Sequence, residues 1–205
     1  MFSLEEMASK LAQDTVDTDN SKDKVGQNNN MKKSKKRVIT FGRWEDQQLE
    51  WTVLREDKTK VFCLCNMIPY YYDLDRNTKF EMSYAYDCLE KEFYNEAFSK
   101  DEQKLIVNHK IADENKVMKC NVFLLSEEES EKFLSKSQKK LDMNWLLRSY
   151  DRNSSDELVI KYVNTDGDVL GNSLNNVFYF KIERGFFGSE REFKIGLRPA
   201  IIIRK

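Results

Sequence analysis

The chain contains one histidine, the residue type that most often serves as a general base near neutral pH. His109 lies in the segment Val107-Asn108-His109-Lys110, where helical spacing ends. No motif partner stands near it in sequence. A general base at this position is one interpretation. We favour the other, an exposed histidine at a helix terminus.

Four cysteines could hold a metal ion or act as nucleophiles: Cys63, Cys65, Cys88 and Cys120. Structural zinc sites typically use two cysteine pairs, each separated by two to four residues and placed in turns. This chain has a single pair, Cys63-x-Cys65, and it lies within a strand pattern. We therefore expect reduced thiols that are buried as small hydrophobic side chains, and we expect no metal and no cofactor.

Oxygen-bearing side chains at alternate positions resemble the start of a calcium-binding loop. They are Asn164, Asp166 and Asp168, but the later glutamate is missing and Gly167 stands in the wrong position. Asp-Gly between apolar segments is typical of a hairpin turn, which we favour. No glycine-rich phosphate loop, G-x-S-x-G or H-E-x-x-H motif occurs in the sequence.

Two stretches combine aromatic and polar side chains, as binding loops on a rigid scaffold often do. One is 69–73, a predicted loop with three consecutive tyrosines, and the other is 149–153, which follows an apolar strand. The candidate ligand-binding residues are Arg148, Ser149, Tyr150, Arg152, Asn153, Tyr70 and Tyr71. Ordinary surface tyrosines are an equally good interpretation of the first stretch.

Two apolar strand segments each contain a single arginine, Arg148 and Arg198. A buried guanidinium needs carboxylate or carbonyl partners, and Glu50 and Glu92 are candidates because each lies beside an aromatic residue. We expect the arginines to lock the C-terminal strand to the sheet. The alternative is a cleft in which one arginine binds an anion. The residues with an expected structural role are Glu50, Trp51, Glu92, Trp145 and Arg198.

The composition predicts one globular domain with a substantial core, since 40% of the 205 residues are hydrophobic. A net charge of −1 gives no electrostatic footprint for nucleic acid. The first residues lack a basic segment followed by an apolar one, and no apolar window approaches the length of a membrane span. We therefore expect no secretory signal, no membrane span and a cytoplasmic location.

The elements that would position these residues follow from hydrophobic periodicity. Residues 1–36 read as a flexible tail, with a possible short amphipathic helix, a polar linker and a basic run at 32–37. Residues 37–205 read as a single domain. Strands are predicted over 38–42, 49–54, 60–65, 121–125, 145–149, 158–163, 177–182 and 195–203. Helical spacing and capping boxes predict helices over 83–98 and 99–106 and one that begins after Ser126, so the fold class is α+β.

Seven residue blocks in one order carry a resemblance. They are Phe41-Gly42-x-Trp44, Glu50-Trp51-x-Val53-Leu54, Leu89 to Ser99, Val122 to Ser126, Trp145 to Ser149, Tyr162 to Gly167, and Gly196-x-Arg198-Pro199-Ala200. This order resembles a bacterial family of domains of unknown function, number 6273, over about residues 38 to 203. That family is distantly similar to C-type-lectin-like domains. The resemblance implies a mostly antiparallel twisted sheet, with the N- and C-terminal strands paired and two or three helices between them.

The resemblance says more about the fold than about the function, because the family has no assigned chemistry. Its sulfatase-modifying relatives use a cysteine pair near the C-terminus, whereas this chain has no cysteine after Cys120. We therefore expect a non-catalytic recognition module that binds a protein or a glycan through the loop at 150–157. The alternatives are an enzyme of unknown class with an arginine–carboxylate cleft, and an interaction protein that acts through its tail.

Overall fold

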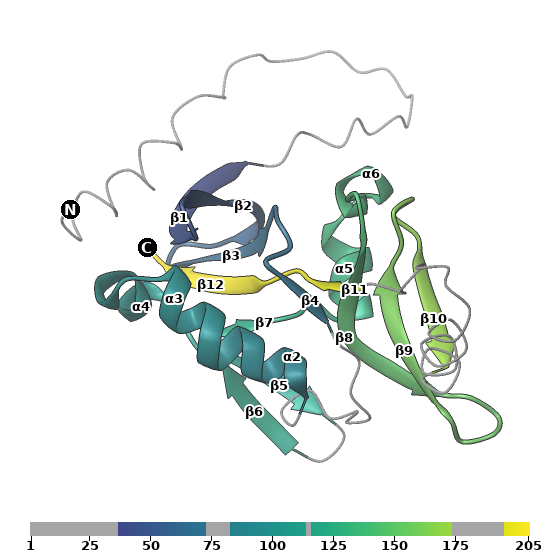
Figure 1. Cartoon of the computed structure of the whole chain (residues 1–205). Coiled ribbons are helices and arrows are strands. Elements are labelled where there is room, and N and C mark those ends of the chain that lie inside the picture. The colour runs from purple at the N-terminus through teal and green to yellow at the C-terminus, as the bar shows by residue number, and fades with distance from the viewer. Residues whose placement is uncertain (1–36, 73–82, 114–115, 174–194) are drawn as a thin grey trace, which may run out of the picture.

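The computed structural model describes residues 37–72, 83–113, 116–173 and 195–205 (Figure 1). The expected tail at 1–36 and the strand expected at 177–182 lie outside these ranges. Within them the fold is α+β and mostly antiparallel, as the sequence predicted. The strands form two five-stranded sheets and a separate hairpin, rather than one sheet.

The first sheet contains the opening meander. Its order is β1 (Val38–Trp44), β2 (Gln47–Glu56), β3 (Lys60–Cys65), β12 (Ala200–Arg204) and β7 (Val122–Phe123). The β2–β3 turn forms because the Asp57 carboxylate accepts hydrogen bonds from the backbone N–H groups of Thr59 and Lys60. The expected pairing of the N- and C-terminal strands is wrong, because β12 pairs with β3 and β7 while β1 lies at the edge.

The second sheet has the order β10 (Val169–Ser173), β9 (Leu158–Val163), β8 (Asn144–Arg152), β11 (Ile195–Leu197) and β4 (Tyr70–Tyr72). The pairing of β11 with β8 is parallel, and its pairing with β4 is antiparallel. The remaining hairpin joins β5 (His109–Asp113) to β6 (Lys116–Cys120), and the sequence did not predict it.

The C-terminal stretch is two strands, not the single strand that we predicted over 195–203. Figure 1 shows β11 and β12 as one continuous run that leaves the second sheet and enters the first. The break lies at Arg198-Pro199. Proline has no N–H to donate to a strand ladder, and it restricts the residue before it, so the chain turns into the other sheet there.

The helices lie between the strands in sequence. A continuous helical run comprises α2 (Tyr84–Tyr86), the π-helical η2 (Asp87–Phe93) and α3 (Tyr94–Ala97). It packs on the first sheet, since α3 contacts β1 and η2 contacts β7. Capping boxes at Ser99 and Ser126 begin α4 (Lys100–Leu105) and α5 (Glu127–Phe133), as predicted. A short helix that was not predicted, α6 (Lys136–Lys139), leads into β8.

One hydrophobic core links the two sheets and the helical run. Its largest fully buried side chains include Trp51, Trp145, Phe93 and Phe123, so both tryptophans lie in the core. The four cysteines are also buried and carry free thiols. In the described ranges no helix is long and apolar enough to cross a membrane.

Candidate functional site

Arg148 does not stand in an open cleft. Its Nη1 lies 2.5 Å from Glu129 Oε2 on α5 and donates at 2.6 Å to the carbonyl of Leu124. The two charged side chains are only 14% and 18% exposed. Burial by itself raises the pKa of the Glu129 carboxyl, but the Arg148 hydrogen bond and charge outweigh it and hold that pKa below its ordinary value.

The carboxylate partners that we predicted for the arginines are wrong. Glu50 and Glu92 are both exposed, whereas Glu129 is half-buried against Arg148. Glu129 is the third residue of α5 and also completes the capping box of that helix. The capping motif was the one sequence signal that fixed the position of this glutamate, but nothing in the motif pointed to an arginine in a strand 19 residues further along.

His109 extends the same cluster, which corrects its prediction as an exposed residue at a helix end. It begins strand β5, is half-buried, and stacks on Phe123 with ring centroids 4.4 Å apart. Its Nε2 lies 3.8 Å from Glu129 Oε1. Burial and the charge of Arg148 lower the pKa of His109, and Glu129 only partly opposes them, so the ring is neutral at pH 7.

Ser149 and Lys161 tie the first turn of α5 to the second sheet. The Ser149 hydroxyl accepts a hydrogen bond of 2.8 Å from the backbone N–H of Glu127. The Lys161 ammonium lies 2.7 Å from Asp151 and 3.6 Å from Glu127. Arg148 and Ser149, which we predicted as ligand-binding residues, therefore fasten a helix to strand β8.

The predicted binding loop at 150–157 is mostly a strand and a self-contained turn. Tyr150 and Arg152 belong to β8, so the loop proper spans 153–157. Asn153 organises it: its side-chain oxygen accepts from the N–H groups of Ser155 and Glu157, each at 2.9 Å. The Arg152 guanidinium bonds to Asp156 in the same turn. These polar groups form hydrogen bonds within the turn, which weakens the prediction that they bind a ligand.

The predicted tyrosine loop is also a strand, β4, and its side chains alternate between two faces. Tyr70 packs against Trp44, whereas Tyr71 is 64% exposed on the other face. Through β11, Tyr71 is in register with Trp145, and Arg152 follows Trp145 by seven residues on β8. That offset is roughly 20 Å along a strand. The structure therefore does not bring Tyr71 and Arg152 together.

Arg198 lies at the corner between the sheets and is 3% exposed. Its Nε donates to the carbonyl of Cys65 at 2.8 Å, its Nη1 reaches the carbonyl of Gln138 at 3.4 Å, and its guanidinium lies 5.0 Å from the Trp145 ring. Burial lowers the pKa of Arg198 to about 10, so the guanidinium stays protonated at neutral pH. These contacts support the predicted locking role, with carbonyl groups as the partners.

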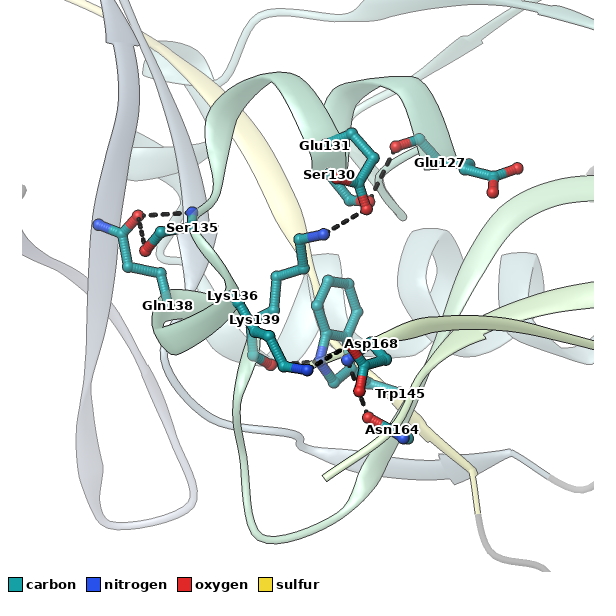
Figure 2. Close-up of polar contacts among 10 residues, drawn as sticks. All are labelled: Glu127, Ser130, Glu131, Ser135, Lys136, Gln138, Lys139, Trp145, Asn164 and Asp168. Atoms are coloured by element: carbon teal, nitrogen blue, oxygen red, sulfur yellow. Dashed lines mark hydrogen bonds and ion pairs between the residues drawn. The ribbon is translucent and has the colours of Figure 1, made fainter. Parts of the chain in front are cut away.

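The segment beside this corner is shown in Figure 2, where the Lys139 side chain extends toward Glu131 and the Trp145 indole lies beneath it. The Trp145 N–H donates to the Lys139 carbonyl at 2.9 Å. Below them, the Lys136 ammonium on α6 lies 2.5 Å from the carboxylate of Asp168, a residue of the β9–β10 turn. These contacts hold α6 to both β8 and the turn.

That turn is the hairpin that we favoured over a calcium loop. The Asn164 side-chain oxygen accepts from the N–H groups of Asp166 and Asp168, at 3.0 and 2.9 Å. Gly167 has a φ of +82°, which favours glycine. The side-chain oxygens of Asn164 and Asp168 thus accept hydrogen bonds from other groups of the protein. Over the described ranges, no group of three histidine, cysteine or acidic side chains is placed to hold a metal ion.

The cysteines behave as buried hydrophobic side chains. Burial raises the pKa of Cys63 to about 12 and that of Cys65 to about 11, so both thiols stay protonated at neutral pH. A protonated thiol is a poor nucleophile and a poor metal ligand. The predicted packing role is supported for this pair.

A surface of which the sequence singled out only Tyr70 lies where the end of β1, β4 and the helical run meet. We call the side chains of Trp44, Tyr70 and Tyr84 the aromatic face. The Trp44 ring centroid lies 5.1 Å from those of Tyr70 and of Phe93, which is fully buried beneath them. Trp44 and Tyr70 are half-buried and Tyr84 is 42% exposed.

The helical run that supports the aromatic face is π-helical over η2, although its sequence predicted ordinary helical spacing. π-helical turns are rare and are often found at functional sites. Two exposed carboxylates, Glu92 and Glu96, border the face and act electrostatically on the Tyr70 hydroxyl. The residue spacing within a single strand or helix does not reveal this arrangement, because its members come from three separate elements.

Comparison with known proteins assigns the family. A family model described as a domain of unknown function, DUF6273, matches residues 49–205. The chain belongs to the DUF6273 family. The DUF6273 match begins within β2 and runs through β12, so it includes strands of both sheets as well as the Arg198 corner. No curated protein and no solved structure matches the chain.

Proposed function

We propose that this DUF6273 domain is a non-catalytic recognition module that binds a protein or glycan ligand through the aromatic face. The observation that carries the proposal is that Trp44, Tyr70 and Tyr84 are accessible, while the buried Phe93 supports the first two from beneath. Rigid aromatic side chains offer a large contact area and lose little conformational entropy on binding. Their location on two strands and a helix favours a preformed surface.

The enzyme alternative has less support. An arginine–carboxylate cleft would need Arg148 to face a ligand, but its guanidinium bonds to Glu129 and to the Leu124 carbonyl. The polar groups of the loop at 153–157 are likewise used within the turn. The alternative of an interaction protein that acts through its tail concerns residues outside the described ranges.

We also propose, from the resemblance, that the fold is related to C-type-lectin-like domains. The mostly antiparallel strands support this relationship, and so does the position of the C-terminal strand in the middle of a sheet. The separation of β1 from β12 by two strands is a departure from it.

The test is ligand binding by the full chain on a glycan array and a peptide array. Tyr84→Ala removes an exposed ring of the aromatic face, and Tyr71→Ala is the matched control because it removes an exposed tyrosine from the other face of β4. We expect an array ligand whose binding is lost in Tyr84→Ala and kept in Tyr71→Ala. Absence of any such ligand, or equal losses in the two variants, would contradict the proposal.

A further inference from the structure

We propose that the aromatic face recognises a cationic side chain, lysine or arginine, presented by a peptide segment of a partner protein. This inference rests on the proposed function and names the chemistry of its ligand. It is carried by the combination of aromatic rings with two exposed carboxylates that border them.

Glu92 and Glu96 lie on the helical run whose Phe93 ring contacts the rings of both Trp44 and Tyr70. Burial raises the pKa of Tyr70, and the neighbouring negative charges of Glu92 and Glu96 raise it further. Tyr84 acts on the same hydroxyl, so these four side chains share one region. A positive charge placed there would face both the rings and the carboxylates.

In the described part of the chain, no ion pair compensates this negative charge. Glu92 and Glu96 are exposed and four residues apart on the helical run, a spacing at which like charges destabilise a helix. Among the residues that the structure describes, neither forms an ion pair. The single lysine of the run, Lys91, is paired with Asp87 at 2.7 Å. A bound cation would relieve the repulsion between the two glutamates.

The rings offer a second attraction for a cation. Trp44 and Tyr70 are tilted by 56° to each other with centroids 5.1 Å apart, so they form two walls of a corner. An ammonium or guanidinium near the face of such rings is attracted by their quadrupole, and most strongly by tryptophan. An aliphatic lysine or arginine stem can lie along the aromatic surface while its charge reaches the carboxylates.

Charge complementarity therefore favours a basic peptide over a glycan. A neutral sugar could stack on the rings, but it would leave the glutamate charges uncompensated. The two classes differ in a way that one experiment separates, because only a cation depends on Glu92 and Glu96.

The probe is a fluorescent glycine–serine peptide that contains several lysines, compared with the same peptide in which each lysine is Nε-acetylated. Binding to the full chain is followed by fluorescence anisotropy at low and moderate salt. We expect the lysine peptide to bind, acetylation to weaken binding about tenfold or more, and added salt to weaken it as well. The double variant Glu92→Gln/Glu96→Gln should lose about tenfold in affinity for the lysine peptide.

The matched control is Glu128→Gln, which neutralises an exposed glutamate on α5. It should bind the lysine peptide as the natural chain does. Because all three glutamates are exposed, circular dichroism should show unchanged folding in both variants. Equal binding of the acetylated peptide, or unchanged affinity in the double variant, would overturn the inference.

The outcomes also separate this inference from the proposed function. A ligand that binds without regard to charge, and that is lost in Tyr84→Ala, would overturn the cation inference and support the recognition module. Failure of the lysine peptide together with the absence of any array ligand that depends on Tyr84 would overturn both.

Discussion

The Arg148 guanidinium and the Ser126 N–H donate to the same oxygen of Glu129, at 2.5 and 3.0 Å. One carboxylate therefore completes the capping box of α5 and at the same time holds that helix to strand β8. Each role fixes the rotamer that the other needs. Loss of the arginine leaves a half-buried carboxylate, and loss of the carboxylate affects both the helix and the arginine.

Arg148→Met should lower the free energy of unfolding by about 3 kcal/mol, since it breaks a largely buried pair from one side. Urea denaturation measures the change. Arg152→Met is the control, because its exposed pair with Asp156 should contribute less than about 1 kcal/mol. A double-mutant cycle with Glu129→Gln should give a clear coupling energy, and additive losses would show that the pair is not the cause.

Arg198→Met should destabilise the protein by about 2 kcal/mol or more, because the carbonyl of Cys65 would be left buried without its donor. Arg198→Lys should also destabilise, since a lysine cannot reproduce the planar set of donors that reaches two carbonyl groups and covers Trp145. Thermal unfolding is the measurement. A lysine variant as stable as the natural chain would mean that only the charge matters at this corner.

Stability should fall as the pH decreases below about 6.5. The pKa of His109 is lower in the folded protein than its ordinary value, so the unfolded chain binds more protons in this range and acidification favours unfolding. Glu129, whose pKa is also lowered, loses its stabilising contribution only at more acidic pH, below its ordinary value of 4.5. His109→Gln should remove the first loss and keep the second, as urea midpoints between about pH 7 and pH 3 would show. A midpoint profile that the substitution leaves unchanged would contradict this assignment.

Gly167→Ala should cost more stability than Gly171→Ala. Gly167 has a φ of +82°, and an added Cβ would lie 2.3 Å from the Lys136 carbonyl oxygen. Gly171 lies in β10 without a positive φ, and an added Cβ would meet a side-chain atom, Val159 Cγ1 at 2.8 Å, instead of backbone. We expect a loss of about 1–3 kcal/mol at the first position and a smaller one at the second, measured by thermal unfolding. Equal losses would mean that the β9–β10 turn does not depend on its contact with α6.

The sequence predicted best what depends on neighbouring residues. The capping boxes at Ser99 and Ser126 located α4 and α5, because a cap is formed by residues three apart in the chain. Alternation located β1, β2 and β3 for the same reason. Both signals are local, and the elements that they predict are present in the packed structure.

Features that depend on distant partners were not predicted. The apolar residues on either side of Arg198 are alike, so their pattern did not reveal that β11 and β12 enter different sheets. Glu129 could not be recognised as the partner of Arg148 before α5 was placed against β8. The three tyrosines at 70–72 suggested an exposed loop, whereas pairing with β11 makes them a strand with two different faces.

The location of the last strands has a consequence for biosynthesis. Because β11 lies between β8 and β4, and β12 between β3 and β7, both sheets stay divided until residues 195–204 are available. A chain emerging from the ribosome in N- to C-terminal order can form the opening meander and the β8–β9 hairpin, but it cannot join them. Native folding therefore requires that residues 195–204 have already been synthesised. Products truncated before β12 would expose strand edges, which makes them aggregation-prone substrates for chaperones and proteases.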